Sequence, residues 1–225
     1  MKVDEIVAEL RALANPRNVE GMARYGISPA NTLGINIPTL RSIAKRAGRD
    51  HALAAELWAT GIHEARIVAA LVDEPARVTK RQMDRWANDF DSWDVVDGCC
   101  GDLFDKTPHA YEQAYRSSRD RREYVKRAGF VLMATLAVHD KGAGDDAFAP
   151  FLPVIERESG DERNFVKKAV NWALRQIGKR DRALNAAAIA TATRIRATGT
   201  KSGRWIAADA LRELQSDAVQ ARLKR

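Results

Sequence analysis

The chain has 225 residues, of which 45% are hydrophobic and 30% charged, with only seven prolines. This composition predicts an ordered protein with a substantial core and argues against a disordered or collagen-like chain. The N-terminus turns acidic before any apolar segment forms, and the longest uncharged apolar runs have eleven residues, too few to cross a bilayer. We therefore expect a cytoplasmic protein with no secretory signal and no membrane partner.

The whole chain has a net charge of +7, and the positive charge is concentrated in its second half. Residues 1–110 carry 14 basic and 16 acidic side chains, whereas residues 111–225 carry 23 and 14. A basic half joined to a near-neutral half predicts a polyanionic partner that lies across one part of the protein. Solubilising surface charge is the alternative explanation.

The common metal, redox and nucleotide motifs are missing from the sequence. Cys99 and Cys100 are adjacent, so they form neither a CxxC pair nor a zinc knuckle, and neighbouring residues are poorly placed to bridge each other. His63-Glu64 lacks the second histidine that a zinc-protease helix needs at position 67, and no glycine-rich phosphate loop is present. We expect reduced structural cysteines, no metal and no cofactor.

Helix signals recur along the whole chain, and no segment has the alternation typical of a strand. Capping residues and prolines mark the starts of the expected helices, and glycines and prolines mark many of the ends. The expected helices cover residues 3–13, 38–47, 51–60, 63–74, 79–90, 121–138, 145–158, 162–180, 183–198 and 202–214, and others begin at Ser92 and Thr107-Pro108. The predicted fold is all-α, in a single domain of residues 1–225.

Part of the sequence repeats at an interval of about 40 residues. Tyr124-Val125-Lys126-Arg127-Ala128 is followed 41 residues later by Phe165-Val166-Lys167-Lys168-Ala169, and a weaker copy begins at Trp205. This period, with paired helices, is typical of HEAT-like solenoids, whose concave side can hold an elongated partner. If the inner helices carry the basic pairs of the two copies, these pairs form a row of positive charge suited to a phosphate backbone.

Two tryptophans each have a charged residue one helical turn away. Trp93 and Asp97 would project from one face of a helix, and an aromatic ring beside a carboxylate is a surface for a cation. Trp172 follows Lys168 by four residues in the later repeat. The alternatives are that the tryptophans fill the core, that Asp97 forms a salt bridge between repeats, and that Asp94 only favours the helix start.

Four segments, in this order, resemble the signatures of the AlkD-type DNA alkylation repair family, which are DNA glycosylases built from HEAT-like repeats. They are residues 33–45 (LGINIPTLRSIAK), 92–97 (SWDVVD), 125–128 (VKRA) and 165–175 (FVKKAVNWALR). The resemblance implies a curved solenoid of antiparallel HEAT-like helix pairs with a concave, basic DNA-binding cleft. It also implies a monofunctional glycosylase that hydrolyses the N-glycosidic bond of cationic N3- or N7-alkylated purines, such as 3-methyladenine and 7-methylguanine, in double-stranded DNA.

The resemblance also assigns roles to positions in this chain. Asp97 matches the catalytic aspartate, Trp93 and Trp172 match the active-site tryptophans, and Arg127 matches a phosphate-contacting arginine. An alkylated purine is already cationic, so Asp97 would stabilise the charge that grows on the sugar and orient the attacking water. Asn36 stands where some relatives have Gln, and Ser92 where others have a tryptophan. The expected DNA-binding residues are Tyr25, Asn36, Lys126, Lys167, Lys168 and Arg175.

A non-catalytic HEAT-like-repeat protein that binds DNA structures or a protein partner is the rival interpretation, because repeat folds often keep their architecture while their function changes. Retention of Trp93, Asp97, Arg127 and Trp172 argues against it, since a scaffold has no need of this set. As a base excision repair enzyme the protein would act as a monomer in the cytoplasm, associated with the nucleoid when bound to DNA.

Overall fold

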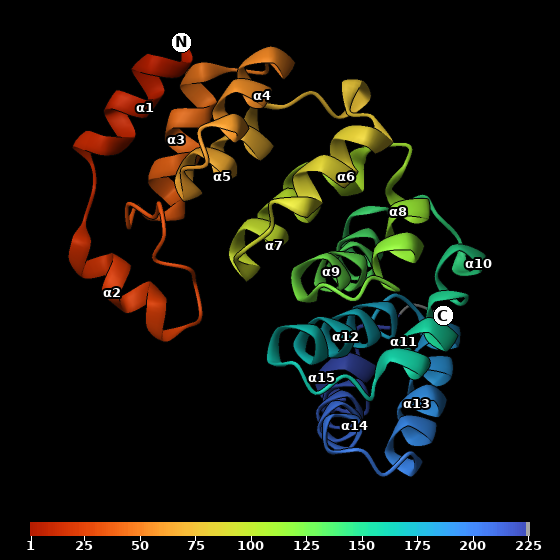
Figure 1. The fold of residues 1–225 in the computed structure, drawn as a ribbon. Coiled ribbons are helices and arrows are strands. Elements are labelled where there is room, and N and C mark those ends of the chain that lie inside the picture. Colours follow the sequence, from red (N-terminus) through yellow and green to blue (C-terminus); the bar gives the residue numbers. More distant parts are fainter. Residues whose placement is uncertain (224–225) are drawn as a thin grey trace. The chain divides into compact units, whose positions relative to one another are not determined.

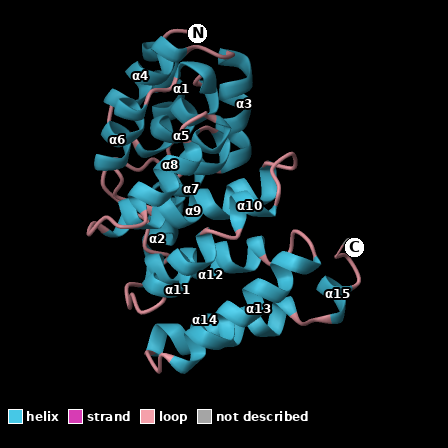
Figure 2. Cartoon of the chain, turned by 90° about the vertical axis from the view of Figure 1, so that its right-hand side faces the viewer, coloured by secondary structure: helices cyan, strands magenta, loops and turns pink. Residues whose placement is uncertain are grey.

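The computed structural model describes residues 1–223, and this part of the chain consists of helices and loops only (Figures 1 and 2). The predicted all-α fold is confirmed. No helix in the same range is both long enough and apolar enough to span a membrane. The helices are α1 (Val3–Ala12), α2 (Pro16–Arg24), α3 (Ile37–Ala47), α4 (His51–Ala59), α5 (His63–Val72), α6 (Lys80–Asn88), α7 (Trp93–Asp102), α8 (Ala110–Ser117), α9 (Glu123–His139), α10 (Asp145–Phe148), α11 (Phe151–Glu158), α12 (Asn164–Ile177), α13 (Arg182–Ala197), α14 (Lys201–Leu214) and α15 (Asp217–Gln220), with 3-10 turns at Pro75–Arg77 and Phe104–Lys106.

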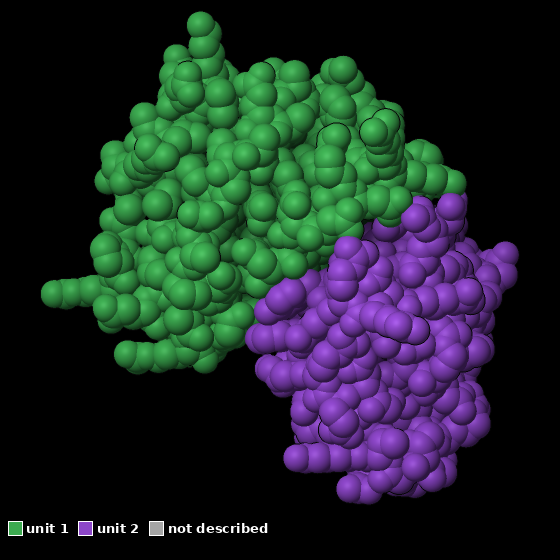
Figure 3. Space-filling model, in the orientation of Figure 1, with its two compact units in different colours: residues 1–109 green, residues 110–225 purple. Residues whose placement is uncertain are grey.

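The packing divides the chain into two compact units, residues 1–109 and 110–225 (Figure 3). In unit 1, helices α3, α5 and α7 pack in a row, α4 packs on α5, and α1 contacts both α4 and α5. The core of this unit includes a stack of two indole rings, Trp58 on α4 and Trp86 on α6, whose centroids are 4.0 Å apart. The single domain expected over residues 1–225 stays a prediction.

The helix starts follow the expected capping chemistry at several positions. Asp50 Oδ1 accepts hydrogen bonds from the backbone N–H groups of Ala52 and Leu53, at 2.9 and 3.0 Å, and the Thr79 hydroxyl caps α6 in the same way. Such caps satisfy N–H groups that have no partner within the helix. The sequence signals therefore located these helix starts correctly.

Two expectations about helix boundaries were wrong. Pro16 was expected only to end the preceding helix, but it also begins α2, because a proline at the first helical position gives up no hydrogen bond. The expected helix over residues 145–158 is broken into α10 and α11. Pro150 lies between them and has no backbone N–H with which to continue the first helix.

A buried carboxylate holds the loop that leads into α3. Glu64, on α5, is fully buried and accepts hydrogen bonds from three successive backbone N–H groups, those of Leu33, Gly34 and Ile35, at 2.9, 2.7 and 3.3 Å. Three charge-assisted hydrogen bonds offset the cost of burying the carboxylate. The segment of residues 33–36 is therefore attached to α5 as well as to α3.

Glycine is required in this loop at position 34. Gly34 has a φ of +79°, and a Cβ added there would lie 2.3 Å from the backbone oxygen of Asn15. The same approach lets Asn18 Nδ2 donate a hydrogen bond to the Gly34 carbonyl at 2.8 Å. The loop thus joins the start of α2 to α5, which places α2 within unit 1.

Unit 2 contains three helix pairs, α8 with α9, α11 with α12, and α13 with α14, and two short helices, α10 before α11 and α15 after α14. Within it α12 lies between α9 and α14, and α11 packs on α13 (Figure 1). The repeat seen in the sequence has a direct structural counterpart. Tyr124 and Phe165 occupy the first turns of α9 and α12, and their rings stack with centroids 5.8 Å apart.

Candidate nucleic-acid interface

Trp93 and Tyr25 meet in unit 1, although they are 68 residues apart in the sequence. Trp93 is the first residue of α7, and its indole N–H donates a hydrogen bond to the backbone carbonyl of Tyr25 at 3.1 Å. Tyr25 ends α2, and its side chain is 76% exposed. Two residues that were predicted to contact the DNA are therefore joined in the fold, through the side chain of Trp93 and the backbone of Tyr25.

Asp97 lies one turn after Trp93 on α7 and is partly exposed. The opposite side of the helix is buried through Val95, Val96 and the two cysteines, residues 99 and 100. A helix with this distribution presents positions four apart on one face. The aromatic ring and the carboxylate expected from the sequence thus share the accessible face of α7.

Asp94 is tied to the structure in a different way. Its carboxylate accepts a hydrogen bond from the Ser92 hydroxyl at 2.5 Å and lies 2.9 Å from Nε2 of the buried His63. Burial by itself would lower the pKa of His63, but the hydrogen bond and the negative charge of Asp94 raise it above its ordinary value. Burial likewise opposes ionisation of Asp94, yet these partners lower its pKa. Asp94 therefore anchors the start of α7 to α5.

The side chain of Asn36 caps α3. Its Oδ1 accepts hydrogen bonds from the backbone N–H and the hydroxyl of Thr39, at 3.0 and 2.9 Å. The residue is exposed and its oxygen is occupied, whereas its amide nitrogen makes no hydrogen bond within residues 1–223. A DNA contact through Asn36 stays a prediction, and it would use the amide nitrogen as a donor.

Arg127 is buried inside unit 2, with only 6% of its surface exposed. Its Nη1 donates a hydrogen bond of 2.7 Å to the backbone carbonyl of Phe165, in the first turn of α12. A guanidinium that bonds the backbone of the neighbouring repeat holds α9 and α12 in register. The phosphate contact implied by the family resemblance stays a prediction for this residue.

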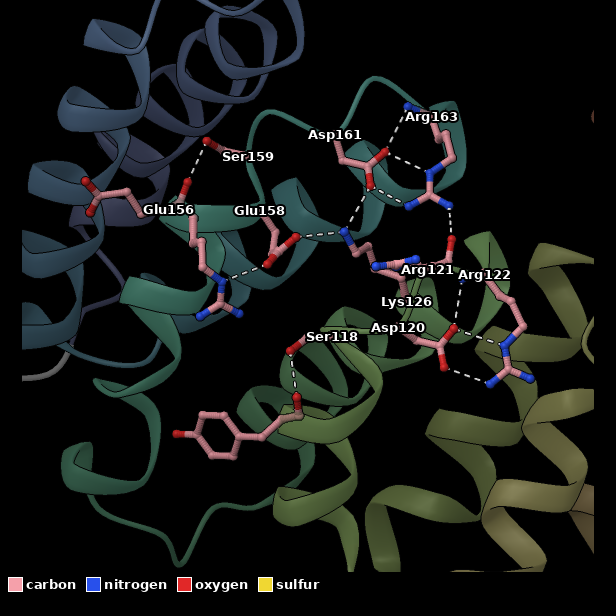
Figure 4. A network of polar contacts seen from close by, with 12 residues as sticks. Ser118, Asp120, Arg121, Arg122, Lys126, Glu156, Glu158, Ser159, Asp161 and Arg163 are labelled. Atoms are coloured by element: carbon pink, nitrogen blue, oxygen red, sulfur yellow. Dashed lines mark hydrogen bonds and ion pairs between the residues drawn. The ribbon is translucent and has the colours of Figure 1, made fainter.

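Lys126 forms ion pairs with two carboxylates (Figure 4). Its Nζ lies 2.7 Å from Glu158 and 3.2 Å from Asp161, and only 12% of the side chain is exposed. Burial raises the pKa of Asp161, but hydrogen bonds from Arg163 and Lys126 outweigh this effect and lower it to about 2. The charge of Lys126 is therefore balanced within the protein.

An Asp-x-Arg motif precedes each of the two clear repeats, and the sequence interpretation missed it. Arg122 pairs with Asp120 before α9, and Arg163 pairs with Asp161 before α12, with Nη2 to Oδ2 distances of 2.7 and 2.6 Å (Figure 4). Arg163 Nη1 also donates to the carbonyl of Arg121 at 2.7 Å and so links the two loops. The spacing of 41 residues made this signal readable in the sequence.

Helix α12 is joined to α14 along its length by side chains four residues apart. Lys167 Nζ lies 5.5 Å from the centroid of the Trp205 ring, and Asn171 Nδ2 donates to Asp209 at 2.6 Å. One turn further, Arg175 pairs with Asp209 and Glu213. Arg175 and Lys167, both expected to bind DNA, therefore have partners on α14.

Lys168 differs from the other basic residues predicted to form the interface. It is exposed, and its side chain makes no hydrogen bond or ion pair with the part of the chain that the structure describes. Trp172 lies one turn later on α12 and is partly exposed. Lys168 and Trp172 thus share an accessible face, as Trp93 and Asp97 do on α7.

A family model and a solved structure both match this chain. A family model described as DNA alkylation repair enzyme matches residues 6–214. No curated protein gives a significant match. One solved structure is described as a new family of proteins related to the HEAT-like repeat DNA glycosylases with affinity for branched DNA structures. It aligns with a TM-score of 0.76 and 21% identity over 86% of this chain and 83% of its own. The predicted HEAT-like fold is confirmed.

Proposed function

The chain belongs to the DNA alkylation repair enzyme family, and on this premise we propose that it is a monofunctional DNA glycosylase for cationic alkylpurines. Its substrate is double-stranded DNA that carries purines alkylated at N3 or N7. The reaction is hydrolysis of the N-glycosidic bond, which starts base excision repair. The protein acts as a monomer in the cytoplasm and on the nucleoid.

The observation that carries the proposal is the accessible face of α7, where Trp93 and Asp97 lie one turn apart. An alkylated purine leaves as a neutral base, so the bond between N9 and C1′ breaks without a general acid. Positive charge then grows on the sugar, and the carboxylate of Asp97 stabilises it electrostatically. Water adds to C1′ and loses a proton, which Asp97 or solvent accepts.

Aromatic faces complete the proposed site. The ring of Trp93 attracts a cationic nucleotide through its π face, and the exposed Tyr25 of the same unit lies against the lesion strand. In unit 2, the π face of Trp172 offers the same attraction to a nucleotide. Lys168, exposed one turn from Trp172, contacts the phosphate backbone. Lys126, Lys167 and Arg175, already paired with side chains of unit 2, support the face of Lys168 and Trp172 by holding the repeats of that unit together.

A second candidate function is binding of DNA structures without catalysis. It is favoured by the solved structure described above, whose family has affinity for branched DNA structures. Under this alternative, the face of α7 is a surface for DNA and Asp97 has no chemical role. The two candidates differ in whether a base is released.

Replacement of Asp97 by asparagine tests the proposal. We expect Asp97→Asn to reduce release of 3-methyladenine and 7-methylguanine from methylated duplex DNA by about 100-fold or more, as for loss of a group that stabilises transition-state charge. Duplex affinity should stay close to that of the wild type. Asp102→Asn, at the other end of α7, is the matched control and should release bases normally. Wild-type protein that binds DNA but releases no base would establish the non-catalytic alternative.

A further inference from the structure

Trp205 is an exposed tryptophan with no role in the site proposed above. It lies in the second turn of α14, and 41% of its surface is accessible. Trp58 and Trp86, by contrast, are 4% and 1% exposed and belong to the core. A large indole ring in water carries a free-energy cost that core tryptophans do not carry.

The repeat explains why this ring is exposed. Trp205 occupies the position that Tyr124 and Phe165 hold in the preceding copies. The rings of Tyr124 and Phe165 stack on each other, at 5.8 Å, because α9 and α12 are neighbours. Trp205 is the last aromatic residue of this row, and its helix α14 is followed only by the short α15 in the described chain.

One basic side chain lies over the Trp205 ring, and two more are exposed at the start of its helix. Lys167 Nζ lies 5.5 Å from its centroid, and Lys201 and Arg204 are exposed on the first turns of the same helix. Lys201 has no ion pair within residues 1–223, and Arg204 donates to the backbone carbonyl of Gly199 and not to a carboxylate. Two acids lie near this surface: Glu162, which accepts the backbone N–H of Ser202 at 3.0 Å, and Asp209, one turn after Trp205, which pairs with Arg175 and Arg212. The surface is therefore aromatic and net positive.

We propose that Trp205, with Lys167, Lys201 and Arg204, binds an unpaired stretch of a DNA strand. The indole ring stacks on one nucleobase, and the three cations contact the phosphates on either side. Any unpaired base can stack on an exposed aromatic ring, because every base has a π face. The basic side chains contact phosphates, so binding does not depend on the nucleotide sequence. The surface thus recognises the single-stranded part of a frayed or branched DNA.

This inference rests on the proposed DNA binding but concerns a different part of the molecule. The probes are a blunt duplex and the same duplex extended by a single-stranded flap, each carrying a fluorophore, with affinity measured by anisotropy. We expect the wild type to bind the flap DNA more tightly. Trp205→Leu should weaken flap binding about fivefold or more, the lower range for loss of one stacked base, and leave blunt-duplex affinity unchanged.

Two further variants make the result specific. Trp205→Phe keeps an aromatic face and should retain most of the flap affinity, which a loss of fold would not allow. Leu13→Ala removes an apolar side chain of similar exposure, 43%, and should change neither affinity. The thermal unfolding midpoint of each variant verifies that it is folded.

The outcomes separate the two proposals. Unchanged flap affinity in Trp205→Leu overturns the inference, while base release by the wild type still supports the glycosylase. Equal weakening on both probes also overturns it, because Trp205 would then belong to a general duplex surface. Failure of the wild type to bind either DNA overturns the inference and the proposed function together.

Discussion

The indole N–H of Trp93 donates a hydrogen bond to the backbone carbonyl of Tyr25 at 3.1 Å, and this bond ties the end of α2 to the start of α7. Helix α2 buries none of its own residues, so its position depends on contacts at its two ends. At its other end, Asn18 bonds the loop at Gly34. The face of α7 proposed for catalysis and the exposed Tyr25 are thus held together by few interactions.

Loss of the Trp93 bond should loosen α2. Trp93→Phe keeps an aromatic face and removes the donor, at a cost of about 1 kcal/mol in the free energy of unfolding. We expect faster hydrogen exchange in α2, with no change in α9, and slower base release. Trp172→Phe makes the same substitution in unit 2 and should leave exchange in α2 as in the wild type. Unchanged protection of α2 in Trp93→Phe would show that other contacts position this helix.

The buried carboxylate of Glu64 should contribute strongly to the stability of unit 1. Glu64→Gln removes the negative charge from an acceptor of three backbone hydrogen bonds. We expect the free energy of unfolding, measured in urea, to fall by about 2–3 kcal/mol. Glu56→Gln, on the exposed side of α4, is the control and should change it by less than about 0.5 kcal/mol. Similar losses in both variants would contradict the structural role of Glu64.

Gly34 and Gly48 offer a matched test of the loop before α3. Both have positive φ, +79° and +77°, but a Cβ at Gly48 would meet nothing within 4 Å, whereas one at Gly34 would meet the Asn15 oxygen. Each Gly→Ala change should lower the free energy of unfolding by about 1–2 kcal/mol because of the backbone conformation. Gly34→Ala should lower it further because of the clash. Equal values from urea unfolding would show that the loop moves away at no cost.

The pair of His63 and Asp94 should make stability depend on pH. Because the pKa of His63 is raised in the folded protein, its contribution is complete below the ordinary value of 6.5 and is lost as pH rises through the raised value. Asp94 has a lowered pKa, so its contribution is present above 3.8 and is lost as pH falls through the lowered value. Stability from this pair is therefore greatest between about pH 4 and 6.5.

His63→Gln should remove the part of this dependence that lies at and above neutral pH. Glu64 and Asp91 also add negative potential at His63, so Asp94→Asn should reduce the dependence without abolishing it. The measurement is the free energy of unfolding in urea at a series of pH values, with His109→Gln as the control for loss of a histidine. A wild-type curve that is flat from pH 6 to 8 would exclude a charged His63 in the folded protein.

Lys126 and Lys168, both basic residues of the repeat, should behave differently on mutation. Lys168→Ala should weaken binding to all duplexes alike and lower the salt dependence of binding by about one charge. Lys126→Ala leaves Glu158 and Asp161 without their shared cation and should instead lower the free energy of unfolding by about 2 kcal/mol. Anisotropy titrations at several salt concentrations, with urea unfolding of each variant, test both expectations. Loss of affinity for only some sequences would argue against a phosphate contact by Lys168.

Local sequence signals were enough to predict the helical fold, most of the helix starts and the repeat. Caps such as Asp50 and the period linking Tyr124 to Phe165 are local or evenly spaced signals, so they are readable without contacts. The shared face of Trp93 and Asp97 follows from helical geometry for the same reason. Two helix boundaries were not predicted. Helix α2 begins at Pro16, which was expected only to end the preceding helix, and a break at Pro150 divides α10 from α11.

Only the tertiary structure decided which of these side chains are available to a partner. Lys126 and Lys168 both belong to the basic pairs of the repeat, but Glu158 and Asp161 neutralise the first, and the side chain of the second has no ion pair within the described residues. In the same way, packing gave Asp94 a buried histidine as partner and left Asp97 on the accessible face. The charge and the spacing of these residues can be taken directly from the sequence. Their ion pairs and their burial depend on residues about 30 or more positions away, which become neighbours only when the chain folds.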